Sequence, residues 1–444
     1  MVHDLYTLMI TAGVVSLLFK LLKQPVVLGY IVAGVLVGPY LFGETLVDAH
    51  NVEAWGNIGV LFVLFCIGLE FRIKNLISSG KVAAIGALTI IGGMMILGFG
   101  VGKWAELDTM NSLFLAGMLC MSSTTIVMKA VDEAGLSKAR FVKGATSILI
   151  IEDVVAVVLM VLLSSIAIKH QFDGEELIKK VGVLAITLVV WFICGILIIP
   201  TFLRWVKAYL NDETLIILAL GLCLGMVLTA EEAGFSSALG AFVMGTILAE
   251  TVESHRIEKL MTPLKNVFAA IFFVSVGMMI NPANLLEYWP SILLVCIVVI
   301  VGMILFGTLG CWWGGETMKD AMQTGFSFVQ IGEFSFIIAA LGNSLNVTHP
   351  ALYPIIVASS VVTTFLTPYI MKAAVPCYNA LYKHAPAKLR DKMDKREQQV
   401  AQAEAKTQAE ESHELADKAR RVVRYTFVTK RLLNLFIKNM SEKD

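Results

Sequence analysis

Residues 148–160 read ILIIEDVVAVVLM, an apolar run that two adjacent carboxylates, Glu152 and Asp153, interrupt. The surrounding apolar segment is long enough to enter a lipid bilayer. An ionised carboxylate near the bilayer centre costs about 2.5 to 3.5 kcal/mol on insertion scales, so such residues usually face a protein interior or an aqueous cavity. Successive helical residues lie about 100° apart. The stretch therefore predicts a membrane helix in which one carboxylate faces a substrate cavity and the other faces a neighbouring helix.

The composition of the whole chain agrees with a membrane helix at this place. The 444 residues are 57% hydrophobic and 16% charged, with a mean hydropathy of +0.77, whereas an average soluble domain is about 25% charged. Lys and Arg together number 35, as do Asp and Glu, and this balance indicates no nucleic acid partner. The seven cysteines are single, without a CxxC pair, so the sequence predicts no metal site and no cofactor. These features predict an integral membrane protein.

About thirteen apolar stretches have the length of a membrane span. They lie near residues 5–22, 25–42, 54–70, 82–102, 111–130, 141–167, 177–203, 213–230, 233–251, 263–280, 289–313, 320–342 and 351–376. The predicted fold class is accordingly all-α, a polytopic membrane protein of about 13 transmembrane helices. Very short connections at residues 23–25 and 231–232 leave the count open by one or two.

The charges of the loops between these stretches predict the orientation, because short cytoplasmic loops carry an excess of Lys and Arg. One set of alternating loops is basic and holds Lys20, Lys23, Arg72, Lys74, Lys81, Lys129, Lys138, Arg140, Lys143, Arg204, Lys207, Arg256 and Lys259. The other set holds segments such as GETLVDAHNVEAW and NPANLLEYW, with Lys169, Lys179 and Lys180 as exceptions. With an odd number of spans, the N-terminus is expected outside and the C-terminus in the cytoplasm.

An odd count also permits two inverted repeats of six helices joined by the seventh span, a plan found in secondary transporters. The fifth and twelfth spans would then correspond, and both are interrupted by small or polar residues, in CMSSTTIVM (120–128) and FSFVQIGEFSF (326–336). Broken helices expose carbonyl groups and helix ends that can coordinate a small cation. Packing of helices through small residues is the alternative interpretation. The symmetry of the two interruptions favours the functional interpretation, and the fold that the family resemblance below implies has two crossed discontinuous helices.

A membrane carboxylate can hold either a proton or a metal cation, so the two compete for one site. Such competition is sufficient for exchange, provided that the loaded protein alternates access and the empty, charged site does not cross readily. The alternative for both carboxylates is a buried ion pair or a neutral, hydrogen-bonded acid.

Seven segments of the chain, in this order and spacing, resemble the monovalent cation:proton antiporter 2 family, which includes sodium/proton exchangers and the membrane units of potassium-efflux systems. They are KQPVVLGYIVAGVLVGP (23–39), GVLFVLFCIGLEF (59–71), SSTTIVMKAVDEAG (122–135), the IIEDVVAVV run, SSALGAFVMGTILAE (236–250), FFVSVGMMIN (272–281) and QIGEFSF (330–336). The resemblance covers nearly the whole membrane region.

The resemblance implies roles for residues at matching positions. Asp153 matches the aspartate that carries the transported monovalent cation and the proton, and Ser123, Thr124 and Thr125 match the unwound part of the first discontinuous helix. The break of the second discontinuous helix is matched by Gln330, Gly332 and Glu333, of which Glu333 is expected to stabilise the exposed helix ends through its charge. Lys265 and Glu70 match family positions of structural or gating kind.

Two positions depart from the pattern that the resemblance implies. Position 152, commonly Gln, Asp or Asn in relatives, is Glu in this chain, and Met303 stands where many relatives have Lys or Arg. Glu152 would then lack a cationic partner inside the membrane. It would either stay protonated or titrate and carry a second proton. We expect Asp153 to be indispensable and Glu152 to tune the pH dependence.

The composition changes after residue 376. Residues 377–444 are rich in Lys, Glu, Gln and Ala, favour helix and hold no Gly-rich nucleotide-binding fingerprint. The end, RRVVRYTFVTKRLLNLFIKNM, suits an amphipathic helix on the cytoplasmic leaflet or against a regulatory partner, and a solvated charged tail is the alternative. The predicted domains are thus a transmembrane antiporter domain, 1–376, with core and scaffold subdomains, and a cytoplasmic tail, 377–444.

The prediction for the whole chain is a secondary active transporter, not an enzyme, that exchanges Na⁺ or K⁺ for protons in a bacterial inner membrane. The resemblance implies a homodimer packed through the scaffold subdomain and surrounded by membrane lipid. Two alternatives stay open at this point: a potassium-efflux channel-like unit gated by its tail or by a separate subunit, and a membrane sensor that transports nothing.

Overall fold

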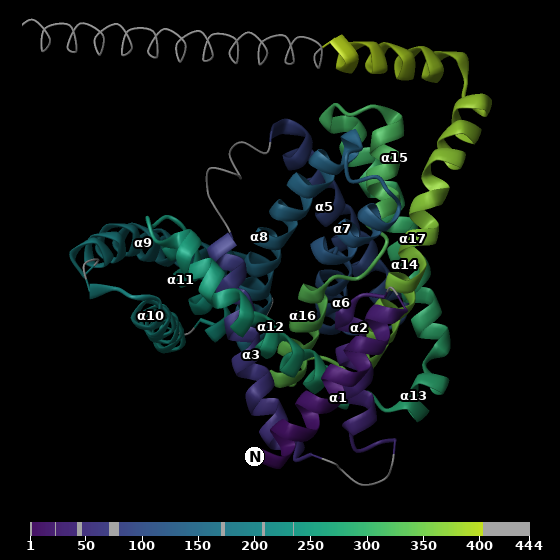
Figure 1. Cartoon of the computed structure of the whole chain (residues 1–444). Helices are drawn as coiled ribbons and strands as arrows, with labels where there is room; N and C mark the ends of the chain where they lie inside the picture. The colour runs from purple at the N-terminus through teal and green to yellow at the C-terminus, as the bar shows by residue number, and fades with distance from the viewer. Residues whose placement is uncertain are drawn as a thin grey trace, which may run out of the picture. The chain divides into compact units, whose positions relative to one another are not determined.

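The computed structural model describes residues 2–22, 24–41, 47–70, 80–169, 174–206, 209–233 and 235–402. Lys23, Arg72, Lys74, Lys207 and the predicted amphipathic end of the tail lie outside the described residues. The chain divides into two compact units, Met1–Asn379 and Ala380–Asp444. Within the described ranges every regular element is a helix (Figure 1).

The helices follow one another along the chain with short connections. They are α1 (Val2–Leu21), α2 (Val26–Val37), α3 (Ala49–Glu70), α5 (Gly80–Trp104), α6 (Thr109–Leu119), α7 (Thr124–Glu133), α8 (Arg140–Lys169), α9 (Gly174–Val206), α10 (Asp212–Glu232), α11 (Ser237–Ala249), α12 (Ser254–Met278), α13 (Pro282–Glu287), α14 (Trp289–Gly314), α15 (Met318–Ser327), α16 (Glu333–Ser344) and α17 (Leu352–His384). Residues 387–402 form a further helical segment.

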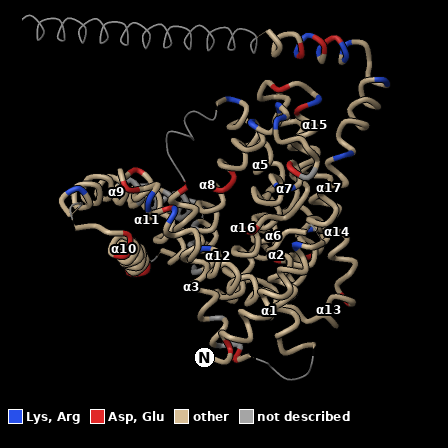
Figure 2. The backbone as a smooth tube through the Cα atoms, viewed as in Figure 1, with Lys and Arg blue, Asp and Glu red and all other residues tan. Residues whose placement is uncertain are grey.

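Eight helical segments of the described part are long and apolar enough to cross a membrane. One of them, Thr109–Asp132, covers α6, the connection after it and most of α7. Long stretches of the helices carry neither Lys or Arg nor Asp or Glu, as Figure 2 shows. Every predicted span falls on a helix or on a pair of short helices, while the count of thirteen spans and the inverted repeat stay predictions.

The helices of residues 1–379 pack in two groups. In the first, which we call the α3 group, α3 packs against α11 and α12, and α2 packs against α1 and α12. Glycines allow these close approaches, because a Cβ atom on Gly34 would lie 2.7 Å from the Cα of Gly277 and one on Gly68 would lie 3.0 Å from the Cα of Gly245. Small residues at helix contacts are common in membranes, where hydrophobic burial does not drive association.

The second group, the α5 group, contains the two adjacent carboxylates. In it α5 packs against α6, α8 and α14, α14 packs against α15, and α16 packs against α6 and α8. Gly307 faces Gly325 across the contact of α14 with α15, where an added Cβ would lie 2.7 Å from the Gly325 Cα. Since α8 also contacts α9 and α11, it joins the two groups.

The structure differs from the sequence-based expectation at two helix boundaries. The segment NPANLLEYW, expected as a loop, contains the short helix α13, which the Asn281 side chain opens by accepting a hydrogen bond from the Ala283 N–H at 3.0 Å. Helix α17 continues to His384, past the predicted end of the span at residue 376. Pro368 and Pro376 lie inside α17 without ending it.

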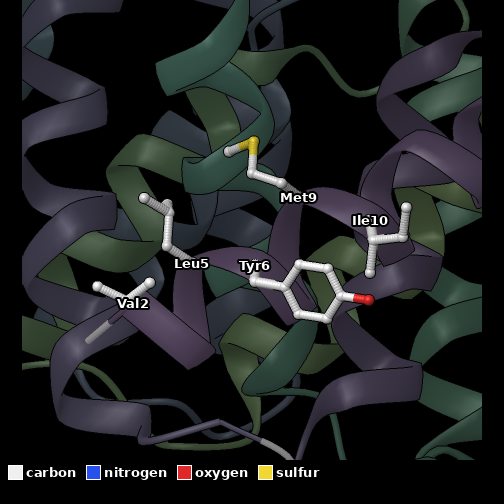
Figure 3. Close-up of a pocket in the computed structure, with 5 residues that line it drawn as sticks. All are labelled: Val2, Leu5, Tyr6, Met9 and Ile10. Atoms are coloured by element: carbon white, nitrogen blue, oxygen red, sulfur yellow. The ribbon is translucent and has the colours of Figure 1, made fainter.

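The first helix presents an apolar face that no described part of the chain covers. Val2, Tyr6 and Ile10 are 86%, 65% and 51% exposed. With Leu5 and Met9 they line a shallow hollow of about 440 Å³ (Figure 3). Such a face suits an apolar environment.

The second unit is described only from Ala380 to residue 402. The Tyr382 hydroxyl donates a hydrogen bond to Asp394 Oδ1 at 2.9 Å, which joins the end of α17 to the helical segment that follows it.

Candidate ion-binding site

The first predicted interruption is a break between α6 and α7, at residues 120–123. Ser123 has an extended backbone, with φ −93° and ψ 118°, and its side chain accepts a hydrogen bond from the Ile126 N–H at 3.4 Å. This cap lets a new helix begin in the protein interior, where Ser122 and Ser123 are each only 2% exposed. The polar residues of the stretch therefore end one helix and begin the next.

The second predicted interruption is a break between α15 and α16, at residues 328–332. All five residues are buried. Glu333 is the first residue of α16, so its carboxylate lies where the positive end of the helix dipole favours an anion. The resemblance implied that Glu333 stabilises the exposed helix ends through its charge, and this role stays a prediction.

The two breaks cross in contact with each other, and we call residues 118–123 with residues 328–335 the crossing. Four hydrogen bonds join the two sides of the crossing: Gly332 N–H to Met121 O at 2.8 Å, Ser122 Oγ to Phe328 O at 3.1 Å, Ser335 Oγ to Met118 O at 2.5 Å, and the Gln330 side chain to Ser123 O at 3.3 Å. A Cβ atom on Gly332 would lie 2.7 Å from the carbonyl carbon of Ser122. The crossing therefore depends on a residue without a side chain at position 332.

Gln330 connects the crossing to α17. Its Nε2 donates a hydrogen bond to Ser123 O at 3.3 Å, and its Oε1 accepts one from the Thr367 hydroxyl at 3.4 Å. The side chain is fully buried, so both ends of the amide have a partner in a place where an unpaired polar group would destabilise the fold. Gln330 therefore fixes one break to the other instead of pointing into open space.

Glu152 faces the crossing from α8 and is 1% exposed. Its Oε2 accepts a hydrogen bond from the Ser122 N–H at 3.2 Å, whereas its Oε1 is buried without a hydrogen-bond partner in the described part of the chain. Met303 is also fully buried, and its sulfur lies 3.9 Å from the hydroxyl of Ser122. Glu152 forms no ion pair with any described residue. Ser122, which donates to Glu152, has the uncharged Met303 as a neighbour.

Asp153 lies one residue further along α8 and is partly exposed. Its polar neighbour is Thr124, whose buried hydroxyl group interacts with the Asp153 carboxylate. Glu333, Glu70 and Lys265 are charged groups close enough to Asp153 to interact with it. Asp153 therefore lies near the start of α7 and the start of α16, while Glu152 contacts the backbone of the break between α6 and α7.

Lys265 and Glu70 lie on the α3 group opposite the carboxylates of the α5 group. The Lys265 Nζ is 2.9 Å from Glu70 Oε1, and the two side chains are 27% and 54% exposed. Lys265 also acts on Glu333 and on Asp153. The resemblance placed both residues at positions of structural or gating kind, and the structure brings their ion pair close enough to interact with Asp153 and Glu333.

A cavity of about 290 Å³ reaches the crossing from the loop between α1 and α2. Ser123, Thr125 and Glu333 line it, together with Lys20 and Lys129. Thr125 is exposed, unlike Ser123 and Thr124. The structure thus brings all the predicted site residues to one crossing, but it divides them between the cavity wall, the Asp153 neighbourhood and the buried contacts.

A second cavity of about 500 Å³ lies at the other end of α2, next to Pro39 and Tyr40. The ends of α12, α16 and α17 complete its lining, through residues such as Ser275, Asn343 and Tyr353. None of the predicted site residues lines this cavity. The two cavities therefore differ in their access to the crossing.

Sequence reasoning missed the hydroxyl groups of α17. The Ser360 hydroxyl donates to Ile331 O at 3.1 Å, and the Thr363 hydroxyl accepts from the Ile331 N–H at 3.4 Å. With Thr367, which donates to the Gln330 side chain, they pair several polar groups of the second break. Their spacing of three and then four residues in SVVTTFLT places them on one helix face, and this spacing was the signal available in the sequence.

Within the described residues no three His, Cys, Asp or Glu side chains gather as a resident metal site would require. The groups that could hold a single monovalent cation are the Asp153 carboxylate, the Thr124 hydroxyl and the main-chain groups of the breaks. Oxygen ligands of this kind suit hard cations.

A comparison with known families finds a match over most of the chain. The family described as sodium/hydrogen exchanger, transmembrane, matches residues 7–375. The chain belongs to this family. The resemblance drawn from the sequence is thereby confirmed, and the family is one of transporters rather than of catalytic enzymes. Together with the apolar helices, this makes the chain an integral multi-pass membrane protein.

Several proteins are similar over most of the chain. The putative cation/proton antiporter YbaL of Escherichia coli is 29% identical over 374 residues, which are 82% of this chain but 66% of YbaL. The K⁺/H⁺ antiporter subunit KhtU of Bacillus subtilis is 28% identical over 394 residues, covering 86% of this chain and 96% of KhtU. The chain thus spans just under two thirds of the length of some relatives and nearly all of others.

A solved structure has a similar fold. The sodium proton antiporter MjNhaP1 of Methanocaldococcus jannaschii superposes with a TM-score of 0.59, covering 84% of this chain and 94% of MjNhaP1 at 17% identity. This likeness concerns the fold alone. It agrees with the all-helical architecture described above.

Proposed function

We propose that the protein is a secondary active transporter that exchanges a monovalent cation, Na⁺ or K⁺, for protons by alternating access at a carboxylate site near the membrane midplane. The observation that carries the proposal is the position of Asp153, which lies near the starts of both second half-helices at the crossing. The names of YbaL and KhtU, a cation/proton and a K⁺/H⁺ antiporter, support it.

Asp153 is the residue that would bind either ion. A carboxylate that holds a proton cannot at the same time offer the same negative charge to a metal cation, so the ions compete. The Thr124 hydroxyl, which is buried beside Asp153, is proposed as a second ligand, because hydroxyl and carboxylate oxygens suit hard cations. Ser123 and Thr125 extend the polar path along the cavity wall.

The helix groups and cavities support a mechanism of alternating access. The α5 group would be the core that carries the ion, and the α3 group the scaffold against which it moves. The cavity of about 290 Å³ contains residues of the crossing, whereas the cavity of about 500 Å³ at the other end of α2 contains none. The described state is therefore proposed to open toward the α1–α2 loop, which the basic loops assign to the cytoplasm.

Proton flux in proteoliposomes that contain a pH-sensitive dye tests the proposal. Adding Na⁺, K⁺ or Li⁺ outside is expected to move protons in the opposite direction for at least one of the cations. The response identifies the ion and establishes exchange in one measurement. If no cation moved protons while K⁺ leaked down its own gradient, the protein would be a channel-like unit, and the exchange proposal would be wrong.

Glu152 is proposed to tune exchange and not to carry the cation. An ionised carboxylate that is 1% exposed and has no cationic partner among the described residues would be costly, so we propose that Glu152 remains neutral in this state. Glu152→Gln, which mimics the neutral acid, is expected to keep exchange within about threefold of the wild-type rate at neutral pH, a change of less than about 1 kcal/mol.

The pH dependence separates the roles of the two carboxylates. The rate of Glu152→Gln should depart from wild type only on the alkaline side, where the wild-type residue loses its proton and places a second negative charge next to Asp153. Exchange rates measured at several pH values check this. Loss of exchange at every pH, as complete as in Asp153→Asn, would contradict the proposed role of Glu152.

Further properties of the assembled protein are proposed on the same basis. We assign residues 1–376 to the transport domain and residues 377–444 to a cytoplasmic tail that binds a regulatory partner. The N-terminus would lie outside a bacterial inner membrane. The exposed apolar face of α1 would meet lipid or a second copy in a homodimer formed by the α3 group.

A further inference from the structure

The first half of the second broken helix, α15, is attached to the start of α8 by a cluster of charged side chains. One guanidinium nitrogen of Arg140, Nη2, lies 3.1 Å from Glu316 Oε2 and 3.1 Å from Asp320 Oδ2. Arg140 is the first residue of α8, and Asp320 is the third residue of α15. The three side chains are only 30%, 20% and 12% exposed, in the order Arg140, Glu316, Asp320, so solvent screens them less than it would a surface pair.

The cluster also holds the N-terminus of α15 in place. Thr317 caps the helix, accepting a hydrogen bond from the Asp320 N–H at 3.2 Å, and its hydroxyl is 2.5 Å from Asp320 Oδ2. Helix α8 runs close to the same carboxylates, because a Cβ atom on Gly144 would lie 3.5 Å from Glu316 Oε1. Asp320 therefore belongs at once to the cap of α15 and to the contact with α8.

The first broken helix has a comparable attachment at the same position of its own first half. Asp108 caps α6 by accepting from the Asn111 N–H at 2.7 Å, and Asn111, again the third residue of its helix, accepts from the His349 N–H at 2.5 Å. His349 precedes α17, far away in the sequence. In both cases the third residue of a capped half-helix reaches a distant segment of the chain, which a local cap alone does not require.

The Arg140 cluster lies at the start of the two helices, α8 and α15, that lead to Asp153 and to the second break. Asp153 follows Arg140 by 13 residues of continuous helix, a rise of about 20 Å. The 10 residues of α15 rise about 15 Å from the cluster to the second break. Because both helices are rigid over these lengths, fixing their starts to each other fixes the height of Asp153 relative to residues 328–332.

We propose that Arg140 and Asp320 are positioning residues, which set the axial position of the Asp153 carboxylate against the second helix break. The pair touches neither ion and acts through the two helices that it joins. This inference rests on the proposed function, since it assigns the pair to cation binding at Asp153. A pair with a structural role alone would change how much protein folds, but not the affinity of the folded protein for the cation.

Cation-dependent proton flux in proteoliposomes, measured over a range of cation concentrations, tests the pair. Arg140→Gln and Asp320→Asn are each expected to raise the KM for the cation about tenfold, with kcat per folded protein changed less than about threefold. Asp320→Asn can still accept the hydrogen bonds of the cap, so it removes the charge and leaves the cap. Arg140→Lys, which keeps the charge, should have a KM between those of Arg140→Gln and the wild type. Lys143→Gln, at an exposed position of the same helix, is the control and should stay within about twofold of wild type.

The double variant decides whether the two residues act as one unit. If they do, Arg140→Gln with Asp320→Asn should have a KM no higher than that of the worse single variant, because the interaction is already lost in either one. Unchanged KM values in the single variants, or KM increases that multiply in the double variant, would overturn the positioning role of the pair.

The same experiment separates this role from the proposed function. If the wild-type protein exchanged no cation, the proposed function and the positioning role would both be wrong. Wild-type exchange with unchanged variants would overturn the positioning role alone.

Discussion

Replacing Asp153 with asparagine is expected to abolish cation-dependent proton movement, lowering the rate by at least about 100-fold. The change keeps the shape of the side chain and removes both its negative charge and its titratable proton. Removing one member of a buried charge pair costs about 3 to 5 kcal/mol, and about 1.4 kcal/mol corresponds to a tenfold change in affinity. The neutral amide therefore loses the cation by a factor of 100 or more.

The surroundings of Asp153 explain why no neighbour can replace it. Glu152 points toward Ser122 and is 1% exposed, so its carboxylate cannot take over cation binding from a shielded position. Glu333 is the first residue of α16 and lies at the positive, N-terminal end of that helix. Lys265 is already paired with Glu70 at 2.9 Å. The loss in Asp153→Asn should therefore be complete for every cation that the wild type accepts.

The measurement is the same proton flux in proteoliposomes, with equal amounts of folded protein as judged by gel filtration. Asp132→Asn provides a matched control, because Asp132 is exposed and accepts a hydrogen bond from the Ser137 hydroxyl at 2.9 Å, which asparagine can also accept. The control should transport at the wild-type rate. Wild-type exchange by Asp153→Asn would show that the ion binds elsewhere and that the crossing is not the site.

The two helix breaks could be predicted because their signals are local. Small and polar residues interrupt apolar runs at CMSSTTIVM and FSFVQIGEFSF, and the structure places its breaks inside these stretches, at residues 120–123 and 328–332. Ser123 is a residue type that favours an N-cap, and it caps α7. A change of hydrogen-bonding pattern within a few residues is visible in the sequence itself.

The assignment of the two carboxylates could be predicted only in part. Helical geometry separates Glu152 from Asp153 by about 100°, so it predicts that they face different targets. The rotation of α8 about its axis decides which of the two carboxylates contacts the buried backbone of the crossing. Packing against α5, α6, α15 and α16 sets that rotation, and the local sequence of α8 does not contain it.

The attachments of the half-helices could not be predicted, because they join residues far apart in the chain. Arg140 and Glu316 are separated by 176 positions, and Asn111 and His349 by 238. From the sequence, Arg140 was only one of the positive charges that orient the loops. The hydroxyl groups of α17 are of the same kind, since their partners lie in the second break and not in α17.

Substituting Gly332 with alanine is expected to reduce exchange at least about tenfold, although only one methyl group is added. Gly332 has φ −79° and ψ 171°, an extended backbone that alanine adopts without strain. The obstacle is space. The new Cβ would lie 2.7 Å from the carbonyl carbon of Ser122, 2.8 Å from its oxygen and 3.0 Å from the nitrogen of Ser123. All three are backbone atoms, which cannot move aside as the end of a side chain can.

The two breaks must therefore separate at the crossing when the methyl group is present. Separation lengthens the 2.8 Å hydrogen bond from the Gly332 N–H to Met121 O and displaces the starts of α7 and α16 from Asp153. Overpacking of this kind typically costs about 1 to 3 kcal/mol, so the melting temperature of the purified protein should fall together with the transport rate.

Gly92→Ala is the control, because an added Cβ at Gly92 in α5 meets no atom within 4 Å and alanine favours helix. Wild-type exchange by Gly332→Ala would mean that the spacing of the two breaks does not determine ion binding, whereas lost exchange with a normal Gly92→Ala would tie transport to the contact of these two backbones.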